Sequence, residues 1–175
     1  MPRIVLFALS ILGLAIAAVA APTLDETAPP PLAGEAKRAD RILVEKAARR
    51  MTLFRGEEAL AVYVVALGFA PEGQKTREGD GRTPEGRYRI DRRNASSRYH
   101  LSLGLSYPTE AQRAAARKAG RDPGGDIFIH GQPNGLPGGL ILPGDWTAGC
   151  IAVSNEEMRE IWSLVDYDVV IDVKA

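Results

Sequence analysis

Residues 127–151 of this 175-residue chain read IFIHGQPNGLPGGLILPGDWTAGCI: a short apolar segment, a loop rich in glycine and proline, and a cysteine followed by another apolar residue. The repeated Gly and Pro residues exclude a helix or a continuous strand across the loop. We therefore expect the loop to fold back and to bring His130, at its start, close to Cys150, at its end. This stretch predicts that the only cysteine of the chain shares a site with a histidine.

A lone cysteine in an exported chain cannot form an internal disulfide, so Cys150 calls for a chemical role. An ordinary thiol is only a few per cent thiolate at neutral pH, and a neighbouring imidazole raises that fraction or takes the proton. Gly149 leaves room for a substrate backbone. The N–H groups around Gly149 and Cys150 are suited to bind the oxyanion of a tetrahedral intermediate, a contribution of about 3 kcal/mol per donor. The pattern predicts acyl transfer through a thioester.

Strand-like segments lie upstream, at 41–45, 50–54 and 59–67, the second with clean apolar and polar alternation. A long loop over 71–86 follows, and strand signals return at 88–90 and 98–105. An alanine-rich surface helix is expected over 109–119, and a short strand over 127–129.

A second helix is predicted just after the cysteine, because Ser154 and Glu157 have the spacing of a capping box. Apolar residues follow at helical spacing, and a final strand is expected over 168–173. Together these segments predict a mostly β fold of the α+β class, with two or more peripheral helices, in a single domain.

The N-terminus predicts an export signal. Arg3 precedes an almost wholly apolar run over 4–19 that closes on small residues. A Pro-rich segment follows instead of basic stop-transfer residues. We expect a cleaved signal peptide over 1–20, a solvated tether over 21–39 and a catalytic domain over 40–175. An uncleaved membrane anchor is the alternative.

Charge and ligand content exclude several classes of partner. The chain has 22 basic and 22 acidic side chains, and removal of residues 1–20 leaves 21 and 22, so it has no global preference for nucleic acid or anionic lipid. A zinc site needs three or four convergent ligands. The nitrogen and sulfur candidates are only His100, His130 and Cys150. We expect no metal, no cofactor, no nucleic acid and no stable membrane insertion after signal cleavage.

The chain resembles the L,D-transpeptidase catalytic domain, or YkuD, family. That family has a His, a spacer, and then Ser or Thr, His, Gly, Cys and a hydrophobic residue; here His130 is followed by sixteen residues and then by TAGCI over 147–151. The segment TPEGRY over 83–88 is similar to the family's Thr-Pro-x-Gly-x-Tyr element. The resemblance extends from about residue 41 to the C-terminus. Two positions differ, because Ala148 replaces a second His and Ala152 replaces an Asn or Arg that many members have.

The resemblance implies a mixed β-sandwich and a periplasmic enzyme that acts on peptidoglycan stem peptides. Cys150, with His130 as base and Gly149 beside it, would attack the carbonyl of the third stem residue and expel the terminal D-alanine. An amine from another stem or from a cell-wall-linked lipoprotein would then accept the acyl group. Two alternatives are a periplasmic peptidase or amidase with the same Cys–His site, and a catalytically decayed cell-wall binding module.

Four further residues are expected to contact the substrate: Gly131, Trp146, Thr147 and Arg93. Arg93 belongs to a group of arginines that are suited to pair with stem carboxylates, although a solvated face is the commoner role of such residues. The alternative role of Thr147 is to cap a turn through its hydroxyl. The alternative role of Trp146 is to pack in the core. For Cys150, the alternative to a catalytic role is packing as a small buried hydrophobic residue. For His130, the alternative is a structural position at the end of a strand.

Overall fold

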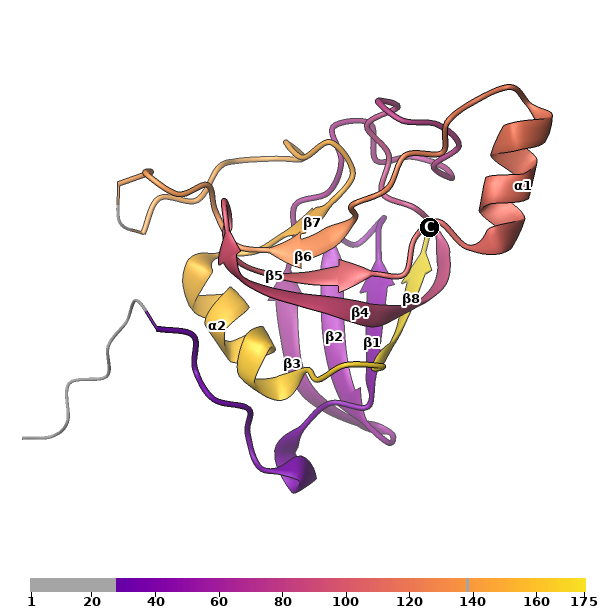
Figure 1. The fold of residues 1–175 in the computed structure, drawn as a ribbon. Helices are drawn as coiled ribbons and strands as arrows, with labels where there is room; N and C mark the ends of the chain where they lie inside the picture. The colour runs from indigo at the N-terminus through magenta and orange to yellow at the C-terminus, as the bar shows by residue number, and fades with distance from the viewer. Residues whose placement is uncertain (1–27, 138) are drawn as a thin grey trace, which may run out of the picture.

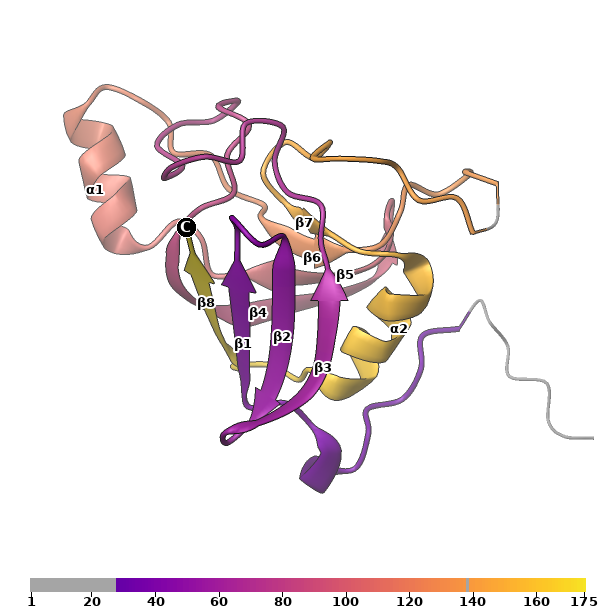
Figure 2. The same cartoon turned by 180° about the vertical axis from the view of Figure 1, so that it is seen from behind.

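The computed structural model describes residues 28–137 and 139–175 (Figure 1, and from behind Figure 2). Eight strands form one sheet in the order β3-β2-β1-β8-β4-β5-β6-β7. The expected signal peptide lies outside the described residues. The strands are β1 (Arg41–Glu45), β2 (Arg50–Arg55), β3 (Glu58–Val64), β4 (Gly86–Ser97), β5 (His100–Leu105), β6 (Phe128–His130), β7 (Ile151–Ala152) and β8 (Val170–Lys174); the helices are α1 (Glu110–Lys118), α2 (Asn155–Leu164) and the short 3-10 turn η1 (Glu35–Lys37).

Strand β4 belongs to both halves of the sheet. Its residues 86–89 pair with β8, and residues 90–97 pair with β5. Register shifts between Ile90 and Arg92 and between Asn94 and Ser97 mark irregularities of the kind that bend a strand. The sheet therefore curls, as Figure 1 shows, and its two halves face each other across the core. The prediction of a mostly β, single-domain sandwich with two helices is confirmed.

The two ends of the sheet meet beside the predicted site. Past the end of β3, Ala66 exchanges backbone hydrogen bonds of 2.9 and 2.8 Å with Ala152 of β7, and Gly68 bridges Thr147. The N–H of Phe69 donates to the carbonyl of Thr147 at 2.9 Å. These contacts hold the segment before Cys150 against the chain that leaves β3.

Alternation along the strands builds the core, because every second residue faces inward. Ile42 of β1, Leu53 of β2 and Ile171 of β8 are completely buried. From α2, Met158 and Ile161 are also completely buried.

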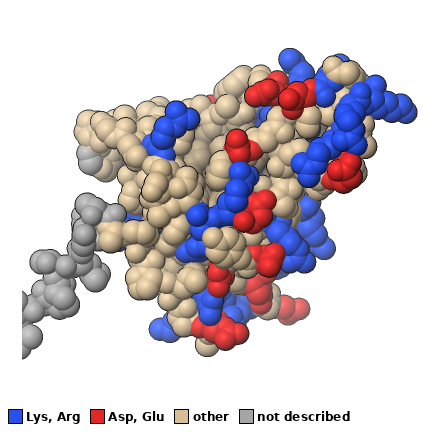
Figure 3. Space-filling view, viewed as in Figure 1, with Lys and Arg blue, Asp and Glu red and all other residues tan. Residues whose placement is uncertain are grey.

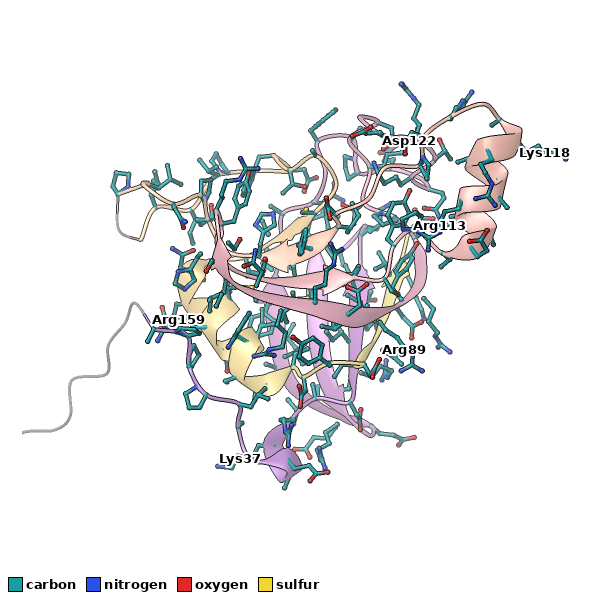
Figure 4. All side chains as sticks on the ribbon, in the orientation of Figure 1. Lys37, Arg89, Arg113, Lys118, Asp122 and Arg159 are labelled. Carbon is teal, nitrogen blue, oxygen red and sulfur yellow. The ribbon has the colours of Figure 1, made fainter. Side chains whose placement is uncertain are left out.

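Both helices begin where their caps predict. Ser154 Oγ accepts the N–H of Glu157 at 3.1 Å, and Glu157 Oε2 accepts the N–H of Ser154 at 2.8 Å, which completes the predicted capping box of α2. Thr109 and Gln112 form the equivalent box on α1. Helix α1 stands at the far side of the molecule from α2, and Arg113 and Lys118 extend from it (Figure 4).

One part of the strand prediction is wrong. The polar segment 91–97 belongs to β4, which continues to Ser97, whereas the sequence predicted a break between 90 and 98. Most of the segment is exposed or half-buried. A strand with one solvated side and a bulge lacks regular apolar alternation, so its pattern gave no signal.

The described part of the expected tether, residues 28–39, lies along α2. The N–H of Ala33 donates to the carbonyl of Ser163 at 2.8 Å, and the N–H of Ala39 donates to that of Leu164 at 2.8 Å. These bonds satisfy carbonyls of the last turn of the helix, which have no partners within it. The domain start at residue 40 stays a prediction.

Charged side chains of both signs are interspersed over much of the face seen in Figure 3, and they are sparse around the loop between β6 and β7. This distribution agrees with the balanced composition. In the two described ranges, neither helix has the length and apolar character needed to cross a bilayer.

Candidate active site

A cavity of about 360 Å³ contains both residues that the sequence predicts to act together. His130 is the last residue of β6, and Cys150 directly precedes β7, which pairs in parallel with β6. The β4–β5 hairpin supplies much of the remaining wall. The lining residues are Asn94, Ser96, Ser97, Arg98, Tyr99, Ser102, Asp126, Phe128, His130 and Cys150.

The imidazole of His130 is buried, with 4% of the residue exposed. Its Nδ1 lies 2.7 Å from the carbonyl oxygen of Gly131. A carbonyl only accepts hydrogen bonds, so Nδ1 carries the proton and Nε2 keeps its lone pair. Burial lowers the pKa of His130, and the bond to Gly131 opposes that shift only in part. The ring is therefore neutral at pH 7 and able to act as a base.

Two aromatic rings hold this imidazole. The ring of Tyr99 lies 4.6 Å from that of His130 between centroids, at 34°, and the ring of Trp146 lies 5.7 Å away, at 64°. Trp146 was expected to contact substrate, and the structure places it against the base. Tyr99 was missed, because it lies in the hairpin turn between β4 and β5 and no motif marks it.

Cys150 is half-buried, and its Sγ lies 3.5 Å from the carbonyl oxygen of Asp126. Burial raises the pKa of the thiol. A backbone hydrogen bond at Phe128 and the charge of Lys75 act in the opposite direction, while the charge of Asp126 adds to the rise. The thiol and the imidazole that line this cavity are therefore both uncharged at neutral pH.

Thr147 shapes the backbone around the thiol. Its Oγ1 donates to the carbonyl of Cys150 at 2.8 Å and accepts the N–H of Gly149 at 3.1 Å. The amide of Gly149 is therefore already engaged, in contrast to the expectation that it binds an oxyanion. The N–H of Cys150 stays the predicted donor. In the structure Thr147 therefore caps a turn, which is the alternative to substrate contact that the sequence left open.

Only glycine fits at position 149. Its φ of +141° is rarely adopted by L side chains, and a Cβ there would lie 2.7 Å from the carbonyl oxygen of Arg82 and 3.2 Å from Ile127 Cδ1. The loop that contains Arg82 thus packs directly on the residue before the nucleophile.

We expect Gly149→Ala to lower the free energy of unfolding by about 2 kcal/mol or more, because it combines an unfavourable φ with a backbone clash. Gly56→Ala is a matched control, because Gly56 has a φ of +58° and nothing lies within 4 Å of its Cβ position. Gly56→Ala should lower the free energy of unfolding by about 1 kcal/mol. Urea unfolding measures this free energy for both variants, and equal losses would contradict the clash at position 149.

Gly131 acts on the base and the loop instead of offering a free surface. Its carbonyl accepts from His130, and its N–H donates to the carbonyl of Tyr99 at 3.0 Å. A Cβ on Gly131 would lie 2.4 Å from Asn155 Oδ1, which accepts the N–H of Gln132 at 2.8 Å. The start of α2 therefore fixes the loop that follows His130.

The structure does not bring Arg93 to the cavity. Its guanidinium donates to the carbonyl of Trp162 at 2.9 Å and to that of Val165, and it lies 4.0 Å from the centre of the Trp162 ring. Both carbonyls belong to the C-terminal end of α2. The expected contact with substrate is replaced by a cap on a helix end, where a cation is favourable.

Arg93→Leu should therefore lower the free energy of unfolding by about 2 kcal/mol, through loss of two charged hydrogen bonds and the stacking on Trp162. Arg89→Leu is the control, because exposed Arg89 makes one bond of 2.8 Å to the carbonyl of Asp168. Chemical denaturation should show a change below about 0.5 kcal/mol for the control. A loss of activity in Arg93→Leu without a loss of stability would instead indicate substrate binding.

Metal ligands do not converge in the described part of the chain: no group of three or more His, Cys, Asp or Glu side chains in 28–137 or 139–175 is placed to hold an ion.

The family model of the L,D-transpeptidase catalytic domain (YkuD) matches residues 39–173. No curated protein matches the chain in sequence.

Several solved structures are similar. Pgp2 from Campylobacter jejuni, a helical cell shape determining protein, is 25% identical with a TM-score of 0.61, and the match covers 78% of this chain and 48% of Pgp2. Bd1075 from Bdellovibrio bacteriovorus is 22% identical with a TM-score of 0.53, over 85% of this chain and 52% of Bd1075. The L,D-transpeptidase from Xylanimonas cellulosilytica is 11% identical with a TM-score of 0.50, and the match covers 80% of this chain and 62% of that protein's chain. The chain spans about half the length of Pgp2.

Proposed function

The chain belongs to the L,D-transpeptidase catalytic domain (YkuD) family, and from this premise we propose that it is a cysteine acyl-transferase acting on peptidoglycan stem peptides through a thioester at Cys150. The observation that carries the proposal is the hydrogen bond from His130 Nδ1 to the carbonyl of Gly131, which leaves Nε2 as a base in the cavity shared with the thiol. The similarity to Pgp2, which determines helical cell shape, supports a cell-wall substrate.

In the first half-reaction, His130 Nε2 takes the proton of the thiol as Sγ attacks a stem carbonyl. The tetrahedral oxyanion lies near the N–H of Cys150. The C–N bond to the leaving D-amino acid then breaks, and the imidazolium returns the proton to the leaving amine. The product is an acyl-enzyme with a C–S bond to Cys150.

In the second half-reaction an acceptor amine attacks the thioester. A C–N bond forms, the C–S bond breaks, and His130 carries the amine proton back to the sulfur. Acceptors with a suitable amine are another stem or a wall-linked lipoprotein. The proposal places the protein in the periplasm after removal of its signal peptide.

Ala148 favours a second outcome in which water is the acceptor. It is exposed beside the nucleophile, at the position where many family members have a His. A smaller and less polar neighbour leaves more room at the thioester and one donor fewer for orienting an amine. The same cysteine and histidine would then act as a peptidase or amidase.

Digestion of sacculi with the purified protein, with and without excess amine, separates these functions. A transferase forms amine-linked muropeptides, and a hydrolase forms only free acids. A carbapenem should also leave an adduct on Cys150 that mass spectrometry detects. Absence of both products and adduct from folded protein with an intact thiol would reject the enzyme, and binding to sacculi in that case would indicate the decayed module.

A further inference from the structure

The loop between β3 and β4 contains a buried ion pair that the mechanism above does not use. Lys75 Nζ lies 2.9 Å from Asp80 Oδ1, and their side chains are only 3% and 7% exposed. Lys75 Nζ also donates to the carbonyl of Arg77 at 3.1 Å. A buried pair of charges is costly unless its hydrogen bonds are satisfied, so this pair needs a structural reason.

Asp80 is the centre of a small network. Besides Lys75, it accepts backbone N–H groups of Thr76 at 2.8 Å, Arg77 at 3.1 Å and Arg82 at 3.1 Å. Burial alone would raise the pKa of Asp80, but the hydrogen bonds from Lys75 and the three amides lower it to about 2. The carboxylate is thus charged at neutral pH and ties both ends of the turn together.

The turn that this network fixes lies directly under the nucleophile segment. The carbonyl of Arg82 faces Gly149, 2.7 Å from where a Cβ would be. The carbonyl of Gly81 accepts the N–H of Ala70 at 3.0 Å, and Thr83 Oγ1 accepts the N–H of Gly68 at 3.0 Å. These contacts hold residues 81–83 against the segment 68–70 and beside Gly149.

The ammonium group of Lys75 also acts on the thiol through its charge. It favours the thiolate form of Cys150, whereas the charge of Asp126 disfavours it. In a buried site such an interaction is screened less than at the surface.

We propose that the Lys75–Asp80 pair is a positioning element for the Cys150 nucleophile: it holds the backbone over 81–83 against Gly149. The proposal rests on Cys150 being the reacting group. Its test reads the thiol itself, so it is independent of which peptide or acceptor is used.

A second buried lysine provides the matched control. Lys46 Nζ donates to the carbonyl of Gly73 at 2.8 Å and lies 2.8 Å from Glu85 Oε1, with its side chain 3% exposed. It therefore resembles Lys75 in burial and in its contacts with the same loop, but it is not among the charged groups that shift the pKa of Cys150.

The experiment measures the rate of alkylation of Cys150 by iodoacetamide against pH, in the full protein, for Lys75→Met, Lys75→Arg and Lys46→Met. The chain has one cysteine, so intact mass reports this thiol alone. Lys75→Met should shift the profile to higher pH and slow alkylation at pH 7 by roughly three- to tenfold. Lys75→Arg should keep the original profile. Lys46→Met should lower the unfolding temperature by a similar amount without shifting the profile.

An unshifted profile in Lys75→Met, or equal shifts in Lys75→Met and Lys46→Met, would overturn the proposal and leave the pair a purely structural role. If Lys75→Met does not fold, Lys75→Gln replaces it, since the amide keeps a donor for Asp80 and Arg77 but removes the charge. The same shift is expected there, and its absence counts equally against the proposal.

Discussion

Cys150→Ala should abolish both adduct formation with a carbapenem and turnover of muropeptides, with a loss of about 10⁴-fold or more. The reason is that no other thiol exists in the chain, so no thioester can form. Product formation is followed by chromatography of digested sacculi, and the adduct by intact mass.

The fold of Cys150→Ala should be preserved, because the thiol is half-buried and its Sγ lies as far as 3.5 Å from the carbonyl oxygen of Asp126. A thermal unfolding curve close to that of the parent protein is the control. Turnover that survives in the folded variant would show that the reaction does not pass through Cys150.

His130→Gln should reduce turnover by about 10²- to 10⁴-fold, the range for loss of a general base. In the parent protein the imidazole must be neutral to take the thiol proton, so the rate falls as pH drops and His130 becomes protonated. Burial lowers the pKa of His130, so this acid limb should lie below the ordinary pKa of histidine, about 6.5. The variant should lack that limb.

The control for the pH profile is His100→Gln. Burial lowers the pKa of His100 too, with the charge of Arg159 acting in the same direction, but His100 is not part of the cavity lining. The acid limb should therefore persist in His100→Gln. If the acid limb disappears in His100→Gln, or if His130→Gln keeps the parent profile, another group is the base.

Local patterns in the sequence predicted much of the site. Glycine and proline in the loop after β6 require a reversal, and that reversal brings His130 and Cys150 together. The capping box at Ser154 fixed the start of α2, because its hydrogen bonds join residues only three apart. Such features need no knowledge of distant contacts.

Other features depend on how distant segments meet, and the sequence did not reveal them. Tyr99 reaches His130 only because β4 and β5 pair in a particular register, with bulges that no motif marks. Arg93 lies on the same strand, and the face it occupies follows from those bulges, since a shift of one residue turns a side chain to the other face. Lys75 and Asp80 lie in a loop of mixed charge, where burial cannot be read from composition.

The join between the two ends of the sheet has a consequence for heat inactivation. It consists of two isolated bridges, Ala66 with Ala152 and Gly68 with Thr147, and β7 itself is only two residues long. Few backbone hydrogen bonds must break to part the ends, so local opening costs less here than elsewhere in the sheet. Because Cys150 lies between Thr147 and Ala152, that opening removes support from both sides of the thiol. We therefore expect warming to loosen the segment around Cys150 first, at temperatures where most of the core is still intact.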